Sequence, residues 1–255
     1  MPNPMTGRTI GRRRVLVGML AAGLAVPAGV AHADAVAPSA PSTPVVAPGY
    51  LDCATFMLHH AQGPEVATLI ARNRDAGRRP VTVGQLAGYL LGAAAPPAEP
   101  LFCLSFDDGY RDQLTNALPV LARLGCPATF FVMGTGWRGD GVHQYLRPEQ
   151  IVEAGQLVEI GSHTINHDPN LIALRRRNPG AYMAEIVVSK QQLEDLLARP
   201  VTSFASPASV YDDTVIADVA RAGYTAAVMT AANQSRVPTR LTADQRYQIP
   251  RARIT

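Results

Sequence analysis

The sequence is poor in several residue types, and these scarcities limit the class of protein. Charged residues make up 17% of the 255 positions and aromatic residues 6%, while apolar residues make up 47% without any long polar tract. This composition excludes extensive disorder and a collagen-like fibre. The three cysteines, Cys53, Cys103 and Cys126, are an odd number. We expect them to pack as small hydrophobic residues, and one disulfide with one free thiol is the alternative.

The sequence also lacks the signals of nucleotide and nucleic-acid binding. Neither G-x-G-x-x-G nor G-x-x-x-x-G-K-[ST] follows a candidate strand. The formal net charge is +3, but the first 33 residues contain four arginines and no acid, and subtracting these four leaves −1 for the remainder. Arg175, Arg176 and Arg177 precede Asn-Pro, which is typical of a solvated turn. We therefore expect no nucleic-acid partner.

A hydrophobic run occurs only near the N-terminus. A basic segment with the paired Arg12 and Arg13 precedes the uncharged residues 15–30, and residues 31–33 (AHA) form a small-x-small cleavage signal. This pattern predicts a secretory leader over residues 1–33, of the twin-arginine type, and an extracytoplasmic location. An uncleaved membrane anchor is the alternative, but the run is shorter than the roughly 20 apolar residues of a spanning helix.

The remaining chain divides into a linker and one folded domain. Residues 34–49 contain four prolines, which block helices and sheet ladders, so we expect an extended linker. Over residues 50–255, short β-rich runs alternate with helical patterns. Strands are expected at 54–59, 101–106, 128–133, 157–161, 202–206, 224–229 and 248–254. Helix ends are marked by Thr82 with Gln85, by Pro148 and Pro179, and by Gly125 and Gly223. Seven strands in one α/β domain favour a distorted (β/α) barrel of parallel strands over a doubly wound sheet.

Polar residues follow four of the expected strands. These residues are His59 and His60, Asp107 and Asp108, His163 and His167, and Ser206 to Ala208. In parallel α/β folds the functional residues gather at the carboxyl ends of the strands, so we expect these side chains to share one edge of the barrel.

The spacing of His163 and His167 allows both imidazoles to face one point. Two histidines and one carboxylate form a three-ligand site with open positions, as catalytic zinc and related metals require. Alone, this spacing is typical of a surface pair. The adjacent Asp107 and Asp108 strengthen the interpretation, because one can bind a metal while the other faces a water molecule. An Asx turn or helix cap would explain only one of these two acids.

Two motifs resemble those of a known family. Residues 104–109 (LSFDDG) and 162–167 (SHTINH) are similar to the first two motifs of polysaccharide deacetylases, carbohydrate esterase family four. Residues 127–132 (PATFFV) and 158–161 (VEIG) are similar to core strands of the family, so the resemblance covers nearly the whole mature chain. It implies a distorted (β/α) barrel and metal-dependent removal of N- or O-acetyl groups from glycans.

The resemblance also implies roles for single residues. It makes Asp107 the general base and Asp108, His163 and His167 the metal ligands, with zinc expected and cobalt or another divalent ion as alternatives. In the third motif of the family a backbone N–H stabilises the oxyanion, and this position falls on Ala208.

A general acid is needed for the leaving amine. Most family members keep a histidine near the C-terminus, but none follows His167 here. Residues 55–60 (TFMLHH) instead resemble the branch that deacetylates poly-N-acetylglucosamine, in which the motif order is circularly permuted and the acid histidine comes first. His59 aligns best and His60 second, and a histidine that only packs beneath the site is the alternative.

The third motif departs from the family pattern. Residues 204–209 (FASPAS) lack its tyrosine and glycine, which removes a wall of the sugar pocket and strains the turn if φ is positive there. Ala205 also leaves Asp107 without the arginine that many relatives place beside the base. We hypothesise that Arg251 supplies this charge from the last strand, the alternative being a surface arginine. Trp137 is a candidate for sugar stacking, with core packing or loop anchoring as alternatives.

Together these features predict a secreted, metal-dependent deacetylase that acts on N-acetylglucosamine-containing glycans, without a membrane span in the mature chain and as a monomer. A glycan-binding relative without catalysis is one alternative, suggested by the altered third motif. The retained acids and imidazoles argue against it, because a decayed site loses converged ligands first. An esterase for O-acetyl xylan is the other alternative.

Overall fold

The computed structural model describes residues 49–134, 144–231 and 239–254. The expected leader, all but the last residue of the expected linker, and Trp137 lie outside the described residues. Within them, no helix has the length and apolar character needed to span a bilayer.

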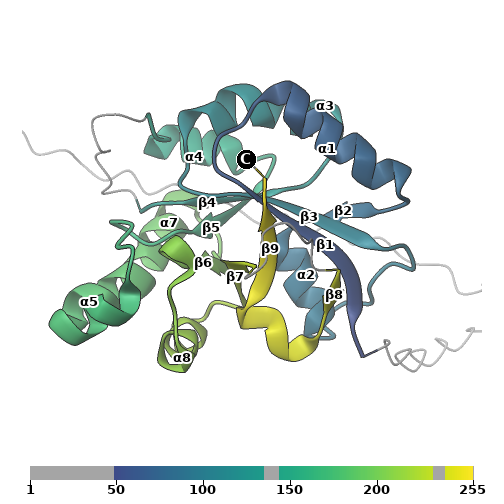
Figure 1. The fold of residues 1–255 in the computed structure, drawn as a ribbon. Helices are drawn as coiled ribbons and strands as arrows, with labels where there is room; N and C mark the ends of the chain where they lie inside the picture. Colours follow the sequence, from purple (N-terminus) through teal and green to yellow (C-terminus); the bar gives the residue numbers. More distant parts are fainter. Residues whose placement is uncertain (1–48, 135–143, 232–238, 255) are drawn as a thin grey trace, which may run out of the picture. The chain divides into compact units, whose positions relative to one another are not determined.

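Seven parallel strands form a closed barrel (Figure 1). The ring closes because β1 pairs with β3 over six residues, from Cys53 opposite Leu101 to Leu58 opposite Phe106. β5 and β6 share only one registered pair, Ser162 opposite Phe204, so the ring is distorted at this point. The barrel strands are β1 (Leu51–Leu58), β3 (Leu101–Phe106), β4 (Thr129–Val132), β5 (Glu159–Ser162), β6 (Ser203–Ala205), β7 (Ala226–Thr230) and β9 (Ile249–Arg253). The predicted seven-stranded (β/α) barrel is confirmed.

Two short strands that the sequence pattern did not predict extend the sheet. β2 (Arg79–Val81) runs parallel to the start of β3, and β8 (Arg240–Leu241) runs antiparallel to the start of β1. Strands of three and two residues are too short to show a hydrophobic alternation.

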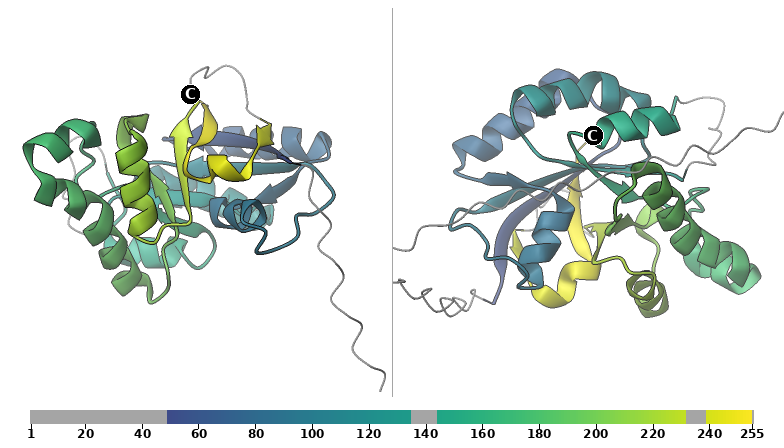
Figure 2. Two further views of the ribbon diagram at one scale, coloured as in Figure 1. Left: turned by 90° about the horizontal axis from the view of Figure 1, so that it is seen from below. Right: turned by 180° about the vertical axis from the view of Figure 1, so that it is seen from behind.

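Helices surround the strands (Figures 1 and 2). They are α1 (Gly63–Asp75), α2 (Val83–Leu90), α3 (Leu118–Arg123), α4 (Pro148–Ala154), α5 (Leu171–Arg177), α6 (Pro179–Met183), α7 (Ser189–Leu197) and α8 (Asp213–Arg221). The short helical turns are the π-helical η1 (Gln113–Ala117) and η2 (Ala184–Val188) and the 3-10 turns η3 (Pro207–Ser209) and η4 (Ala243–Tyr247). The expected helix ends are confirmed: the capping box at Thr82 and Gln85, first-turn Pro148 and Pro179, and Gly125 and Gly223 at positive φ.

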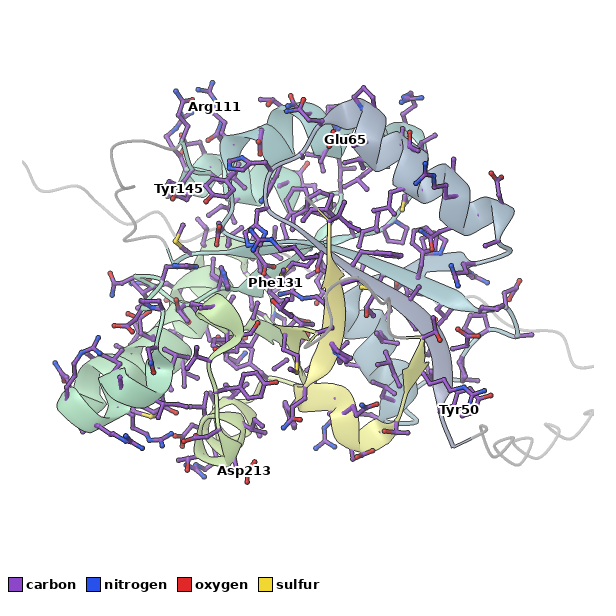
Figure 3. The ribbon with its side chains drawn as sticks, in the orientation of Figure 1. Tyr50, Glu65, Arg111, Phe131, Tyr145 and Asp213 are labelled. Atoms are coloured by element: carbon purple, nitrogen blue, oxygen red, sulfur yellow. The ribbon has the colours of Figure 1, made fainter. Side chains whose placement is uncertain are left out.

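The barrel wall separates an outer hydrophobic core from an inner one, because successive side chains point to opposite faces of each strand. Phe56 and Leu104 pack in the core beneath the outer helices. Cys53, Cys103 and Phe131 instead pack inside the barrel with α2, which contacts both β3 and β7 and covers the amino ends of the strands. Figure 3 shows Phe131 near the centre of the molecule. The opposite end of the barrel, where the strands reach their carboxyl ends, carries the polar residues.

The cysteines have the environment of small hydrophobic residues. All three are free and buried, which agrees with the preferred interpretation and excludes the single disulfide. Cys53 and Cys103 lie in the inner core and Cys126 in the outer one.

Candidate active site

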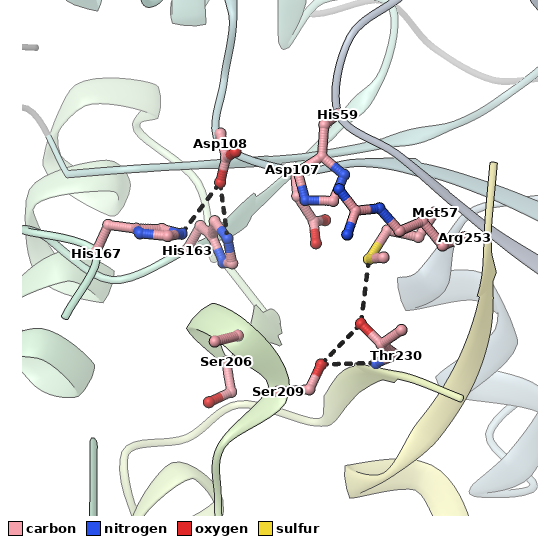
Figure 4. Close-up of a pocket in the computed structure, with 11 residues that line it drawn as sticks. Met57, His59, Asp107, Asp108, His163, His167, Ser206, Ser209, Thr230 and Arg253 are labelled. Carbon is pink, nitrogen blue, oxygen red and sulfur yellow. Dashed lines mark hydrogen bonds and ion pairs between the residues drawn. The ribbon is translucent and has the colours of Figure 1, made fainter. Parts of the chain in front are cut away.

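A cavity of about 380 Å³ opens at the carboxyl ends of the strands (Figure 4). Its walls include six residues that the sequence indicated: His59, Asp107, Asp108, His163, His167 and Ala208. They follow β1, β3, β5 and β6, which lie around one end of the barrel. Strands far apart in the sequence therefore bring these side chains together.

Three side chains converge on one point of this cavity. The Nε2 atoms of His163 and His167 lie 3.1 and 3.2 Å from Oδ1 of Asp108. One ligand atom from each residue lies within 4.8 Å of the other two, so a single ion can contact all three. His163 is 2% exposed and Asp108 8% exposed, whereas the side chain of His167 is 34% exposed, so the site is open to the cavity on the His167 side.

The hydrogen bonds around these atoms fit a cation. Nδ1 of His163 donates to the carbonyl of Ala205 at 2.8 Å, so the neutral imidazole carries its lone pair on Nε2, which faces the carboxylate. Oδ1 of Asp108 is buried and has no well-directed hydrogen bond to a described residue. Two imidazole nitrogens within 3.2 Å of a buried carboxylate oxygen are a donor set that suits a cation, so the residues fit a metal ion.

Asp108 is ionised at neutral pH in this environment. Burial by itself raises its pKa, but in the metal-free protein hydrogen bonds and positive charge from protonated His163 and His167 lower the pKa well below its usual range. The carboxylate is the form that binds a metal ion.

The backbone is strained around this point. Five residues other than glycine have a positive φ here: Asp108 (+71°), Thr164 (+67°), His167 (+55°), Ala208 (+50°) and Ser209 (+55°). One further such residue occurs in the described part of the chain, Ala198 at the end of α7. Strained residues persist where the surroundings fix them, and they cluster at functional sites. The positive φ at Asp108 takes its side chain out of the strand alternation, so that it reaches the same cavity as Asp107.

Asp107 forms a bidentate ion pair with Arg251. The guanidinium nitrogens lie 2.6 and 2.7 Å from the two carboxylate oxygens, and both side chains are buried, at 3% and 2% exposed. Burial raises the pKa of Asp107, but the charge of Arg251 lowers it, and the net result is a pKa below the usual range. Arg251 also donates to Ser105 at 2.8 Å and lies over the ring of Phe131. The hypothesised neighbour of Asp107 is therefore present, carried by β9.

The two adjacent histidines face different surroundings. His59 lines the cavity, and its Nδ1 is buried without a hydrogen bond to a described residue. Burial lowers the pKa of His59, although Asp107 and Asp108 oppose this shift. His60 instead bonds to Asp112 at 2.9 Å and stacks on Tyr110 with ring centroids 4.1 Å apart. The geometry favours His59 over His60 as the candidate acid.

Gln113 was missed by the sequence analysis. Its buried side-chain amide donates to the carbonyl of His59 at 2.8 Å and to that of Asp107 at 2.5 Å. One side chain from the π-helical turn η1 thus ties the ends of β1 and β3 together. A lone glutamine between helical residues gives no signal of this contact in the sequence.

The turn after β6 carries Ala208, and Ser209 beside it makes contacts that the sequence did not indicate. The N–H groups of Ser209 and Val210 bond back to the carbonyls of Ser206 and Pro207, while Ala208 faces the cavity. Oγ of Ser209 accepts from the N–H of Thr230 at 2.7 Å and lies 2.9 Å from its hydroxyl (Figure 4). Ala208 and Ser209 have a positive φ, so the loss of the family's glycine strains this turn, as the sequence analysis considered. The side chain of Ser209 anchors the turn to β7.

The fold and the site define a (β/α) barrel with acid and imidazole groups at the carboxyl ends of parallel strands. The polysaccharide deacetylase family model matches residues 94–227, which is more than half of the chain. The chain belongs to this family.

Known proteins resemble the chain at different levels. YxkH of Bacillus subtilis (strain 168), which its name assigns to the polysaccharide deacetylases, is 30% identical over 145 residues, 56% of this chain and 50% of YxkH. The match thus spans about half of that relative. Among solved structures, the Streptococcus pyogenes deacetylase PplD in complex with acetate has a TM-score of 0.66 at 23% identity, covering 83% of this chain and 93% of PplD. IcaB from Ammonifex degensii has a TM-score of 0.66 at 22% identity, covering 80% and 92%. These two structures share the fold.

Proposed function

We propose that this chain is a secreted, metal-dependent deacetylase that hydrolyses N-acetyl groups of N-acetylglucosamine-containing glycans. Because the chain belongs to the polysaccharide deacetylase family, its general activity is the removal of acetyl groups from polysaccharides. The observation that carries the finer proposal is the convergence of Asp108, His163 and His167 beside the Asp107–Arg251 pair in one cavity.

Asp108, His163 and His167 would hold the ion. Two imidazole nitrogens and one carboxylate oxygen suit zinc, and cobalt is the alternative. When bound, the ion would polarise the acetyl carbonyl and lower the pKa of a water molecule. The bond from His163 to the carbonyl of Ala205 fixes the ring and its tautomer for this role.

The remaining groups move protons. Asp107 is ionised at neutral pH because Arg251 lowers its pKa, so it can take the proton of the attacking water as the hydroxyl adds to the acetyl carbon. The backbone N–H of Ala208 donates to the developing oxyanion. His59, in its imidazolium form, gives a proton to the amine nitrogen as the carbon–nitrogen bond breaks, and the proton taken up by Asp107 returns to solvent or to His59 to complete the cycle. The products are acetate and a free amino sugar.

Two features support the substrate and the location. The candidate acid His59 precedes Asp107 in the chain, which is the order in the poly-N-acetylglucosamine branch. The basic, apolar and cleavage segments of residues 1–33 support export through a twin-arginine leader.

The test is to purify the protein without residues 1–33, measure bound metal, and follow acetate release from N-acetylglucosamine oligomers and from acetylxylan. Asp107→Asn should abolish release, while Asp213→Asn, on the exposed surface of α8, should not change it. Release only from acetylxylan would identify an O-acetyl esterase. Glycan binding without release would identify a non-catalytic relative.

A further inference from the structure

Glu185 is a buried carboxylate that lies next to the candidate metal site without belonging to it. It is 2% exposed and lies in the π-helical turn η2, which joins α6 to α7. Oε2 of Glu185 accepts from the backbone N–H groups of Ile165 at 2.8 Å and Asn166 at 2.9 Å. Oε1 accepts from the side-chain amide of Asn166 at 2.8 Å. All of these donors belong to the three residues between His163 and His167.

The segment from His163 to His167 has a strained backbone and few hydrogen bonds of its own, so contacts from other elements must hold it in place. Thr164 has a φ of +67° and His167 a φ of +55°, conformations that residues other than glycine rarely adopt. The bond within the segment, from the N–H of His167 to Oγ1 of Thr164 at 3.1 Å, connects these two strained residues to each other. The bonds to Glu185 connect the middle of the segment to a helix outside the barrel.

A second tie joins the same helix to the end of β5. The hydroxyls of Ser162 and Ser189 lie 2.9 Å apart, and Ser189 also donates to the carbonyl of Glu185 at 2.7 Å. The N–H of Thr164 bonds to the hydroxyl of Ser162 at 3.3 Å. The η2 and α7 segment therefore holds the histidine segment both where it leaves the strand and at its middle.

We propose that Glu185 is a positioning residue that fixes the His163–His167 segment, so that both imidazoles face Asp108 and the metal affinity is high. This proposal rests on the proposed function. A carboxylate is suited to the role, because its two oxygens accept all three bonds. A glutamine at this position would present only one acceptor oxygen and would turn an NH₂ group toward one of the donors.

Glu159 provides a matched control. It lies at the other end of β5, and its carboxylate accepts three hydrogen bonds, from Gly84 N at 2.8 Å, Thr129 Oγ1 at 2.8 Å and Ser203 Oγ at 2.5 Å. Glu185→Gln and Glu159→Gln therefore remove comparable polar networks, but only the first network touches the histidine segment.

The experiment measures Zn²⁺ affinity by competition with a chelator, the visible spectrum of the Co²⁺ form, and thermal unfolding of the metal-free proteins. We expect Glu185→Gln to weaken Zn²⁺ binding roughly 10- to 100-fold, the usual effect of losing a group that orients metal ligands. Its Co²⁺ spectrum should change, and saturating metal should restore much of its turnover. Glu159→Gln should lower the unfolding temperature and leave the affinity and the spectrum unchanged.

Asn166→Ala is a second variant for the case in which Glu185→Gln does not fold. Asn166 is exposed, and the substitution removes one of the three bonds, so a smaller loss of affinity in the same direction is expected. Unchanged Zn²⁺ affinity in the folded variants, or an equal loss in Glu159→Gln, would overturn the positioning role. A wild-type protein that binds no metal would instead overturn the proposed function on which it rests.

Discussion

Replacing Arg251 tests how the candidate base is held. Both of its hydrogen-bonded nitrogens lie within 2.7 Å of Asp107, and both side chains are almost fully buried. Arg251→Met keeps much of the side-chain volume but leaves the carboxylate without its cation. Removing one partner of a buried ion pair costs about 3–5 kcal/mol of unfolding free energy. Arg251→Lys keeps the charge but loses the planar fork, so we expect a smaller loss.

The same substitution should change the pH dependence of catalysis. In the wild type, burial raises the pKa of Asp107, but Arg251 brings it below the ordinary value, so Asp107 stays ionised until strongly acidic pH. The stability that this pair contributes is present at neutral pH and lost as the pH falls through the lowered pKa. Without the guanidinium only the effect of burial remains, so the acid limb of the pH–rate profile should move to higher pH. Turnover at neutral pH should fall by up to about 10²–10⁴-fold, the range for general-base catalysis.

Arg253 is the control for this prediction. It lies two residues further along β9, lines the same cavity and is exposed, and it has no ion pair with a described residue. Arg253→Met should change the unfolding free energy by less than about 0.5 kcal/mol. Urea unfolding and acetate release across pH measure both effects. Equal, small effects of the two substitutions, with an unmoved acid limb, would refute the reasoning.

Three further predictions concern the rest of the site and the core. His59→Ala should lower turnover by about 10²–10⁴-fold while His60→Ala leaves it nearly unchanged; similar losses in both would remove the assignment of the acid. Ser209→Gly and Ser209→Ala remove the same hydroxyl, but only glycine relieves the positive φ, so urea unfolding should find the glycine variant more stable by about 1 kcal/mol, and the reverse order would contradict the strained turn. The three cysteines should react with a thiol reagent only after unfolding, because burial raises the pKa of each thiol; rapid labelling of the native protein would contradict their burial.

The barrel was predictable because its strands are long enough to show their pattern. In β1 and β3 the inward positions run through Cys53 and Cys103, and continuing the alternation reaches His59 and Asp107. The preference for His59 over His60 therefore follows from the inward and outward alternation of side chains along the strand as well as from the family resemblance. The two strands that were missed, β2 and β8, have no such pattern, and only pairing with β3 and β1 defines them.

The supports of the site could not be predicted in the same way. Glu185, Gln113 and Ser209 act through contacts with loops that are distant in the sequence, and no local spacing encodes such contacts. The positive φ of Asp108 and His167 was also not predictable, because glycine is the residue that normally signals this conformation. The chemistry of the site is thus visible in the residue types, whereas its geometry depends on long-range packing.

The central claim is that Asp108, His163 and His167 share one metal ion. Anomalous X-ray scattering at the absorption edge of zinc, from crystals of the protein grown with Zn²⁺, tests it most directly. The account predicts one strong peak about 2.0–2.2 Å from Oδ1 or Oδ2 of Asp108 and from Nε2 of both histidines. A peak bound by other residues, or no peak beside these three, would contradict it.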